Sequence, residues 1–370
     1  MSERAVIKAD IAIVGAGMAG ASLAAELGGS ASVLILEAED RPGYHATGRS
    51  AAFWSETYGG PLVQPLTTAS GPFLREGGYL KDRGGLHIAA DAEGAAALDR
   101  MARLFAGAVP LERLDRAATV ARIPGLRPGW DHGLFEPTCT DIDVASLHAL
   151  YLAAARRQGA RLVAGARLIA AERRAGGWSL GTTAGPFEAA ILVDAAGAWA
   201  DEVAALAGLA RIGIQPYRRT LVQLRVAPPA SPDLPLVIDA LGFFYFKPEA
   251  GGRLWLSPHD ETASDPCDCA PEEIDVALAV GRLEEVVDWR IERVERRWAG
   301  LRTFAPDRLP VYGFAPGRRD FFWYAGQGGF GIQTAPAAAK LAAALLLGTK
   351  PDESVAGIDP APYAPGRFTN

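Results

Sequence analysis

The feature that most constrains the fold is a strand, a glycine-rich turn, a helix, a second strand and an acid, in that order, at the start of the chain. Residues 9–14 are apolar except for Asp10 and predict a buried strand, and residues 15–20 read Gly-Ala-Gly-Met-Ala-Gly. Residues 21–27 continue as a helix, and the apolar residues 32–36 end at Glu37. Glu37 follows the first glycine at the spacing of about 20 residues that is typical of a Rossmann-like βαβ unit.

Each position of this turn has a physical role. Gly15 allows the tight turn, Gly17 lets the backbone approach a pyrophosphate, and Gly20 lets the helix pack closely on the strand. The amino-terminal end of the helix supplies N–H groups and a positive dipole end for phosphates, and Glu37 can accept a hydrogen bond from a ribose hydroxyl. The sequence therefore predicts binding of a dinucleotide cofactor.

Composition and charge exclude several classes of protein. A net charge of −6 and a pI near 5.5 argue against a nucleic-acid binder. The three cysteines are too few for a disulfide framework, and the pair Cys267 and Cys269 favours an ordinary loop over a metal site. The longest apolar stretch, residues 341–347, is too short to span a bilayer. We expect a soluble, cytoplasmic protein, with peripheral association at the inner face of a membrane left open.

The remaining pattern predicts two interleaved domains, an α/β domain and an α+β domain. We expect a cofactor-binding domain that is formed by residues 1–84, 138–212 and 300–370. Residues 85–137 and 213–299 are expected to form a substrate-binding domain with a mainly antiparallel sheet, because residues 215–289 read as mainly β.

Individual elements follow from apolar periodicity and from glycine and proline breakers. Helices are expected at residues 92–105, 143–158, 200–207 and 334–347. Strands are expected at residues 85–89, 160–164, 168–172, 190–194 and 321–325, with a hairpin near Gly176 and a loop at residues 123–130.

A second glycine-rich turn, at residues 326–331, again joins a predicted strand to a predicted helix. A nicotinamide dehydrogenase usually needs only one such turn. A helix amino terminus that is directed at the N1–C2=O edge of a flavin would stabilise the anionic reduced ring. The second turn therefore favours FAD. The alternative is that its glycines only allow the chain to turn between the strand and the helix.

Short segments spread over the whole chain carry a resemblance to a known family. They are residues 43–52 (GYHATGRSAA), 141–143 (DID), 193–199 (VDAAGAW), 215–219 (QPYRR), 244–248 (FYFKP), 298–302 (WAGLR) and 327–333 (QGGFGIQ). In these segments the chain resembles the D-amino-acid oxidase-like superfamily of FAD-dependent oxidoreductases, and within it the D-arginine dehydrogenase-type D-amino acid dehydrogenases. The resemblance implies a Rossmann-like FAD-binding domain interleaved with a mainly antiparallel substrate domain.

The resemblance also implies a set of cofactor-binding residues. Relatives with covalently bound flavin carry a cysteine after the arginine at position 302, and this chain has Thr303 there, so we expect non-covalent FAD. The residues expected to bind FAD are Gly15, Gly17, Met18, Ala19, Gly20, Glu37, Ala38, His45, Thr47, Gly48, Arg49, Ser50, Ala51, Ala52, Arg167, Leu168, Ala196, Gly197, Trp199, Gly326, Gly328, Gly331, Ile332, Gln333 and Thr334.

The implied reaction moves a hydride from Cα of an amino acid to flavin N5 and leaves an imine that water hydrolyses to a 2-oxo acid and ammonia. Arg302 matches the family's carboxylate-binding arginine, since a carboxylate favours a planar bidentate donor. Arg219 matches a second cation, although the adjacent Arg218 could take this role. Tyr245 matches the tyrosine that caps the carboxylate. The alternative for each of these residues is a position in the core or on the surface without a role in the site.

Other matched positions concern the substrate amine. The Gly329 carbonyl matches the group that holds the amine, with Gln333 as a polar contact and Tyr58 as an active-site tyrosine. No dedicated strong base is evident in the sequence. Deprotonation of the amine is therefore expected to rely on solvent and the local field.

Two departures from the family concern specificity. Phe53 stands where the arginine-preferring members place a histidine, and residues 83–87 (RGGLH) lack the acid that would pair with a cationic side chain. Asp82, the nearest acid, lies outside the matched position. A buried guanidinium without a partner would cost several kcal/mol. We therefore expect a preference for neutral or apolar D-amino acids over D-arginine.

The electron acceptor is harder to predict. Oxygen reactivity often depends on a cation near the flavin, for which His45 and Lys247 are candidates, with surface or loop roles as the alternative. The resemblance favours a dehydrogenase that passes electrons to a quinone or another acceptor. Alternative functions are an N-methyl amino acid oxidase of the sarcosine type, a 2-hydroxy acid dehydrogenase, and a non-catalytic FAD-binding assembly protein.

Overall fold

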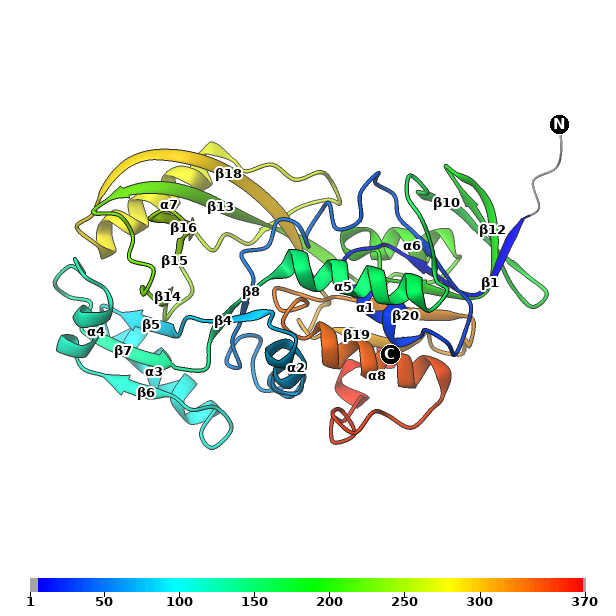
Figure 1. Ribbon diagram of the computed structural model, residues 1–370, viewed down its shortest axis with the longest axis horizontal. Helices are drawn as coiled ribbons and strands as arrows, with labels where there is room; N and C mark the ends of the chain where they lie inside the picture. Colours follow the sequence, from blue (N-terminus) through cyan, green and yellow to red (C-terminus); the bar gives the residue numbers. More distant parts are fainter. Residues whose placement is uncertain (1–5, 369–370) are drawn as a thin grey trace.

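The computed structural model describes residues 6–368 and contains two large β-sheets and one small sheet. Figure 1 shows β1 and β12 toward one end of the elongated molecule and β5, β7 and β14 toward the other. In the same view β13 and β18 run side by side from the second group toward the middle. We call the two large sheets the nucleotide sheet and the substrate sheet.

The nucleotide sheet has the order β10-β11-β12-β1-β2-β9, with β20 paired to β12 and β19 paired to β20. Its strands are β1 Ile7–Val14, β2 Val33–Leu36, β9 Arg161–Val163, β10 Leu168–Arg174, β11 Gly177–Thr182, β12 Gly185–Asp194, β19 Val311–Phe314 and β20 Phe321–Ala325. β1 runs parallel to both β2 and β12, and β12 runs parallel to β20. Helices therefore connect these strands and cover the sheet.

Two apolar layers enclose the nucleotide sheet, because successive side chains of a strand point to opposite faces. One face packs on α1 (Met18–Glu26), α8 (Ala335–Leu347) and, through α1, on α5 (Val144–Arg157). The other face packs on α6 (Ala200–Leu206). Ile11 and Ile13 belong to the first layer and Ala12 and Val14 to the second, which explains why this strand is apolar throughout.

The substrate sheet has the order β17-β13-β16-β15-β14-β5-β7-β6, with β18 paired to β13. Its strands are β5 Gly85–Ala89, β6 Glu112–Leu114, β7 His132–Glu136, β13 Gln215–Ala227, β14 Leu236–Asp239, β15 Tyr245–Glu249, β16 Arg253–Ser257, β17 Thr262–Ala263 and β18 Arg290–Phe304. β5 and β14 are parallel and the other pairs are antiparallel. The helices α3 (Ala92–Leu104), α4 (Arg116–Arg122) and α7 (Glu273–Val286) accompany this sheet.

A small sheet connects the two regions. It has the order β3-β8-β4, formed by Phe53–Trp54, Thr140–Ile142 and Leu80–Asp82, and α2 (Gln64–Glu76) lies between β3 and β4 in the sequence. α2 packs on α8 of the nucleotide region. The chain thus passes between the large sheets through short strands that hold residues 50–58 in place.

Two features differ from the sequence-based expectations. The stretch from residue 215 to 289, predicted to be mainly β, contains the 14-residue helix α7. Its buried residues Val276, Ala279, Leu283 and Val286 recur every three or four positions, as helix packing requires. The predicted boundary at residue 300 falls inside β18, so this strand contributes to both predicted domains. The division into domains itself stays a prediction.

Candidate active site

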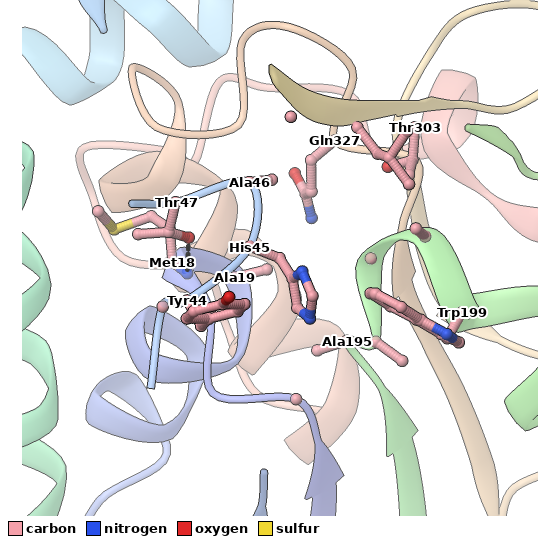
Figure 2. A pocket seen from close by; sticks show the side chains of 18 of the residues that line it. Met18, Ala19, Tyr44, His45, Ala46, Thr47, Ala195, Trp199, Thr303 and Gln327 are labelled. Carbon is pink, nitrogen blue, oxygen red and sulfur yellow. Dashed lines mark hydrogen bonds between the residues drawn. The ribbon is translucent and has the colours of Figure 1, made fainter. Parts of the chain in front are cut away.

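One long cavity borders most of the residues that the sequence singled out. It begins at the first glycine turn, passes residues 43–51 and 195–199, and ends at Arg219, Tyr245, Arg302 and Gly329. Figure 2 shows His45 and Trp199 beside one another in this cavity, with Gln327 and Thr303 on another side. The ring centroids of His45 and Trp199 lie 4.7 Å apart. Segments from both large sheets therefore form one site.

The first glycine turn has the geometry that its sequence predicts. Gly15 adopts a φ of +101°, and a Cβ there would lie 2.5 Å from the carbonyl oxygen of Ala195. A Cβ at Gly20 would overlap the carbonyl oxygen of Gly15, so α1 packs directly on the turn. Thr47 Oγ1 accepts a hydrogen bond of 2.9 Å from the Met18 amide (Figure 2). The turn can therefore accept no larger residue at positions 15 and 20 without moving backbone.

Glu37 supports this turn from the end of β2. Its carboxylate accepts hydrogen bonds from the amides of Ala16, at 2.8 Å, and Glu39, at 3.0 Å, and the residue is buried. It also borders the cavity, where its remaining lone pairs can accept from a ribose hydroxyl. Glu37 thus shapes the turn in addition to the ligand contact that the sequence predicts.

Most predicted cofactor residues border the cavity, and six do not. Those that do are Gly15, Gly17, Met18, Ala19, Glu37, Ala38, His45, Thr47, Arg49, Ser50, Ala51, Arg167, Leu168, Ala196, Gly197, Trp199, Gly328, Gly331 and Ile332. Those that do not are Gly20, Gly48, Ala52, Gly326, Gln333 and Thr334. Sequence reasoning missed Glu39, Tyr44, Cys267 and Cys269, which also border it.

Gln333 lies beneath the cavity wall. Its Nε2 donates to the carbonyls of Ser55 and Tyr58 and to Thr67 Oγ1, and its Oε1 accepts from the Ser55 amide. With these bonds its amide is fully occupied, and 1 % of the residue is exposed. Gln333 therefore holds residues 55–58 in position from below, where the sequence predicted a direct polar contact.

Two arginines and a tyrosine meet at one end of the cavity. Arg219 donates from Nε to the Asp260 carbonyl at 2.7 Å and from one terminal nitrogen to Glu261 at 3.1 Å, while its Nη1 has no partner. Tyr245 Oη is also buried without a partner. Burial, and then the charge of Arg302, lower the pKa of Arg219 to about 10, so both arginines are cationic at neutral pH. This end of the cavity is suited to an anion.

The structure decides between the adjacent arginines. Arg219 borders the cavity, whereas Arg218 forms ion pairs with Glu272 and, at 3.0 Å, with Asp275 of α7. Adjacent residues of a strand point to opposite faces, so only one of them can face the cavity. The acids that hold Arg218 come from the helix that the sequence did not predict.

Of the other predicted site residues, Gly329 borders this end of the cavity, whereas Tyr58 and Phe53 do not border it and contact residues that do. Arg302 donates to Tyr58 Oη at 2.6 Å, and the Phe53 ring lies 5.4 Å from the ring of Tyr58 and 6.1 Å from that of Tyr245. A Cβ at Gly329 would overlap the Tyr58 hydroxyl and lie 2.8 Å from Arg302 Nη1. Glycine at position 329 therefore allows the tyrosine–arginine contact.

A buried carboxylate that the sequence did not reveal fixes the turn before Tyr58. Glu136, at the end of β7, accepts from the Glu56 amide and from Thr57 Oγ1, both at 2.6 Å, and from Ser55 Oγ at 2.9 Å. Burial raises the pKa of Glu136. Because these partners lie about 80 positions away in the sequence, only the folded structure brings them together.

His259 is a second residue that sequence reasoning missed. Its ring lies 5.6 Å from that of Tyr245, and its Nδ1 is 2.6 Å from the Gly242 carbonyl, which assigns the proton to Nδ1. The residue has a φ of +55°, an uncommon conformation for a side chain other than glycine. Burial, and then the charges of Arg219 and Arg302, lower the pKa of His259 to about 3, so it is neutral at physiological pH.

A neutral His259 makes stability sensitive to acid. Its pKa is about 3 in the folded protein and about 6.5 in the unfolded chain, so the unfolded chain takes up the proton first as the pH falls. Its share of the free energy of unfolding is complete above pH 6.5 and decreases toward pH 3. Between pH 7 and 4 the wild type should lose up to about 3 kcal/mol of its free energy of unfolding through His259. The variant His259→Asn should not show this part of the loss, and asparagine tolerates the backbone conformation of position 259. Urea unfolding of both proteins at these pH values measures it; identical pH dependence would contradict the assignment.

The two cations considered for oxygen reactivity differ in position. His45 borders the cavity, with its Nε2 3.0 Å from Glu39. Lys247 does not border it; its Nζ pairs with Asp141 at 2.7 Å, and Arg83 pairs with the same carboxylate at 2.6 Å. Lys247 and Arg83 therefore form a separate buried charge cluster.

Residues 6–368 contain no cluster of side chains that could bind a metal. This part of the chain holds no group of three or more histidine, cysteine or acidic side chains placed for that purpose, and its cysteines are unpaired. Within the same residues, every helix is too short or too polar to cross a bilayer.

A parallel sheet with a glycine turn at β1–α1, and a cavity that runs from that turn to an anion-binding end, define a dinucleotide-dependent oxidoreductase. The family model described as FAD dependent oxidoreductase (DAO) matches residues 10–345. The chain therefore belongs to the DAO family of FAD-dependent oxidoreductases.

Relatives and solved structures agree with this family. A glycine oxidase of Pseudomonas putida is 27% identical over 69% of this chain and 68% of its own length, and one of Geobacillus kaustophilus is 27% identical over 91% and 92%. The crystal structure of the G. kaustophilus enzyme superposes with a TM-score of 0.85 over 97% of this chain and 98% of its own. An L-proline dehydrogenase from P. horikoshii, 21% identical over 98% of each chain, shares the fold with a TM-score of 0.84.

The cavity fits FAD. Its walls include both glycine-rich turns, where added side chains would collide with backbone or with Tyr58. Thr303 borders it beside Arg302, where covalent relatives have cysteine, as expected for non-covalent FAD. The glycine turn at residues 15–20 would hold the phosphates, and residues 327–332 with Thr303 would border the flavin ring.

Proposed function

We propose that the protein is an FAD-dependent D-amino acid dehydrogenase that prefers neutral or apolar substrates over D-arginine. The observation that carries the proposal is the pair of unpartnered buried donors, Arg219 Nη1 and Tyr245 Oη, beside Arg302 in the cavity. Arginine and tyrosine donors that converge without a partner match a substrate carboxylate. Bound FAD supplies the hydride acceptor for oxidation of the carbon–nitrogen bond.

The protein's own groups bind and orient the substrate. Arg302 and Arg219 hold the carboxylate, Tyr245 caps it, and Tyr58 keeps Arg302 in place through its hydroxyl. The Gly329 carbonyl is the proposed acceptor for the substrate amine, which it holds without a change of protonation. The choice of a D-amino acid rests on the family resemblance of residues 43–52, 244–248 and 298–302.

The apolar surroundings support a neutral side chain. Leu221, Leu236 and Tyr245 form a buried cluster against which Phe53 and Ile238 pack. Residues 83–87 (RGGLH), on the strand where an acid would pair with a guanidinium, contain no acid. A cationic side chain there would be desolvated without a partner, which costs several kcal/mol.

Anaerobic mixing tests the proposal. The FAD-loaded protein is mixed with D- and L-amino acids, glycine, sarcosine and 2-hydroxy acids, and flavin absorbance near 450 nm is followed. Rapid bleaching by neutral D-amino acids, with slow reoxidation in air, is the expected result. A kcat/KM for D-arginine well above those of D-leucine, D-methionine and D-phenylalanine would overturn the specificity.

Oxidation of glycine is a second candidate function. The P. putida and G. kaustophilus relatives are both named glycine oxidase, and they support this reading. The same carboxylate site would serve glycine, but the apolar cluster beside Phe53 would then contact no side chain. Bleaching by glycine or sarcosine that is faster than by any D-amino acid, with rapid reoxidation in air, would favour this candidate.

Tyr245→Phe is expected to lower kcat/KM for a D-amino acid by about 10-fold to 100-fold, because a hydrogen bond to a charged carboxylate contributes about 1.5–3 kcal/mol. Steady-state kinetics with an artificial acceptor measure it. Tyr151→Phe is the matched control, since Tyr151 Oη is also buried without a partner but lies in α5, away from the cavity. Equal activities in the two variants would exclude Tyr245 from carboxylate binding.

A further inference from the structure

A second cavity, of about 780 Å³, lies beside the candidate active-site cavity. Ser50 and Ala51 border both cavities, so this short segment forms part of the wall between them. The volume is within the range of about 300–1,000 Å³ that small-molecule sites occupy. Gly78, Ala250 and Gly251 border the second cavity and are exposed, so a small molecule can enter it from solvent without passing through the first.

Strand β15 connects the second cavity to the carboxylate site. Tyr245 borders the first cavity and Lys247 borders the second. Residues two apart in a strand point to the same face, so these two side chains leave the sheet about 7 Å apart. Trp255 of β16 lies opposite Lys247, borders the second cavity, and packs against the cluster that contains Tyr245 and Ala51. The second cavity therefore adjoins the end of the active site at which substrate and flavin would meet.

The buried wall of the second cavity carries excess positive charge. Arg83 and Lys247, whose side chains are each 7 % exposed, both pair with Asp141. One carboxylate thus balances two buried cations. The other charged residues that border this cavity are exposed or half-buried, and they are Lys81, Asp143 and Glu249. The buried wall therefore favours a ligand that carries or gains negative charge.

Two donors of this wall can serve a ligand. The ammonium of Lys247 has three N–H groups, one of which donates to Asp141 at 2.7 Å. Its Nζ lies 5.2 Å from the centre of the Trp255 ring, and Trp255 Nε1 is buried without a hydrogen-bonding partner among residues 6–368. An unsatisfied buried donor costs about 1–3 kcal/mol, so a bound group usually satisfies it. The two donors fit a ligand with acceptor oxygens.

We propose that the second cavity binds the electron acceptor of the enzyme, a quinone whose ring oxygens accept hydrogen bonds from Lys247 and Trp255. Oxidation of an amino acid to its imine removes two electrons and two protons. A quinone takes up both pairs, with FAD as the carrier, and becomes a hydroquinone. Its oxygens gain negative charge as electrons arrive, and the excess positive charge of the wall stabilises that charge. The inference rests on the proposed function and adds the partner that completes its reaction.

The test uses ubiquinone with a single isoprene unit and the FAD-loaded protein. Calorimetry without amino acid, so that no turnover takes place, measures the Kd of the quinone. In a second experiment a neutral D-amino acid bleaches the flavin anaerobically, the quinone is added, and the return of absorbance near 450 nm gives the rate constant of reoxidation. Lys247→Met leaves the pair of Arg83 and Asp141 intact, and Trp255→Phe keeps an aromatic ring. Each should raise Kd, and lower the ratio of reoxidation to bleaching rate constants, by about 10-fold.

Lys340→Met is the matched control, because Lys340 of α8 also pairs with an aspartate, Asp352 at 3.1 Å, and lies outside both cavities. It should change neither value. If Lys247→Met does not retain FAD, Trp255→Phe decides. Values that are unchanged in both cavity variants would overturn the inference, and so would wild-type binding of sulfate in place of the quinone.

Two further outcomes separate the inference from the proposed function. An equal fall of bleaching and reoxidation, with an unchanged Kd, would assign Lys247 and Trp255 to the fold alone and overturn the inference. Failure of every D-amino acid to bleach the flavin would overturn the proposed function, whereas the calorimetric comparison would still decide whether this cavity binds a quinone.

Discussion

Arg302→Lys is expected to lower kcat/KM for a D-amino acid by about 30-fold to 1,000-fold, which corresponds to about 2–4 kcal/mol. Arginine offers a planar fork that matches both carboxylate oxygens, whereas lysine offers one point charge on a flexible stem. Lysine also loses the bond of 2.6 Å to Tyr58 Oη and so releases the tyrosine that packs against Phe53. The loss should appear in KM and in kcat, because the arginine both binds and orients the substrate.

The measurement compares each D-amino acid with the amine that lacks its carboxylate. The wild type should discriminate strongly between the two, and Arg302→Lys should discriminate less. Arg297→Lys is the control, since Arg297 lies on the same strand, half exposed, and pairs with Glu273 of α7. An Arg302→Lys enzyme that keeps the wild-type preference for the carboxylate would remove Arg302 from the proposed site.

Gly20→Ala is expected to abolish FAD retention and to destabilise the protein by about 3 kcal/mol or more. The added Cβ would overlap the carbonyl oxygen of Gly15, and neither atom belongs to a flexible side chain. Relief requires α1 to move away from the turn, which displaces the amides that face the phosphates. The ratio of absorbance at 450 nm to that at 280 nm and the thermal midpoint of the apoprotein measure the two effects separately.

Gly281→Ala is the control for the same chemical change. Gly281 lies inside α7, where an added Cβ would meet no side chain or neighbouring element within 4 Å, and alanine in a helix stabilises by about 0.5–1 kcal/mol relative to glycine. This variant should keep its flavin and unfold at a slightly higher temperature. A Gly20→Ala protein with full flavin content and an unchanged midpoint would show that α1 is not seated directly on the turn.

Local patterns made part of the fold predictable. The first βαβ unit could be placed from the sequence, because its strands are short apolar runs and its turn requires glycine at positions with positive φ or close packing, such as Gly15. α7 was not predicted, although its buried residues have helical spacing. Its exposed face carries Ile274 and Leu278, which weaken the contrast between an apolar and a polar face.

Site residues could be predicted from the sequence only where the residue stands in a short segment that resembles the family. Arg302 and Tyr245 stand in segments that resemble the family, and both border the cavity. The choice between Arg218 and Arg219 depends on the acids of α7 that hold Arg218, and no local pattern shows them. Glu136 and His259 act through partners far away in sequence or on other strands, so their roles depend on tertiary contacts.

The interleaved order of the strands has a consequence for how the protein matures. β1 is made first, yet its neighbour β12 is completed at residue 194, β20 follows at residues 321–325, and the wall formed by Gly328 and Gly331 comes after that. A ribosome synthesises the chain from the amino terminus, so the flavin cavity cannot close until most of the polypeptide has emerged. We therefore expect cofactor loading to be a late event, which follows synthesis of most of the polypeptide.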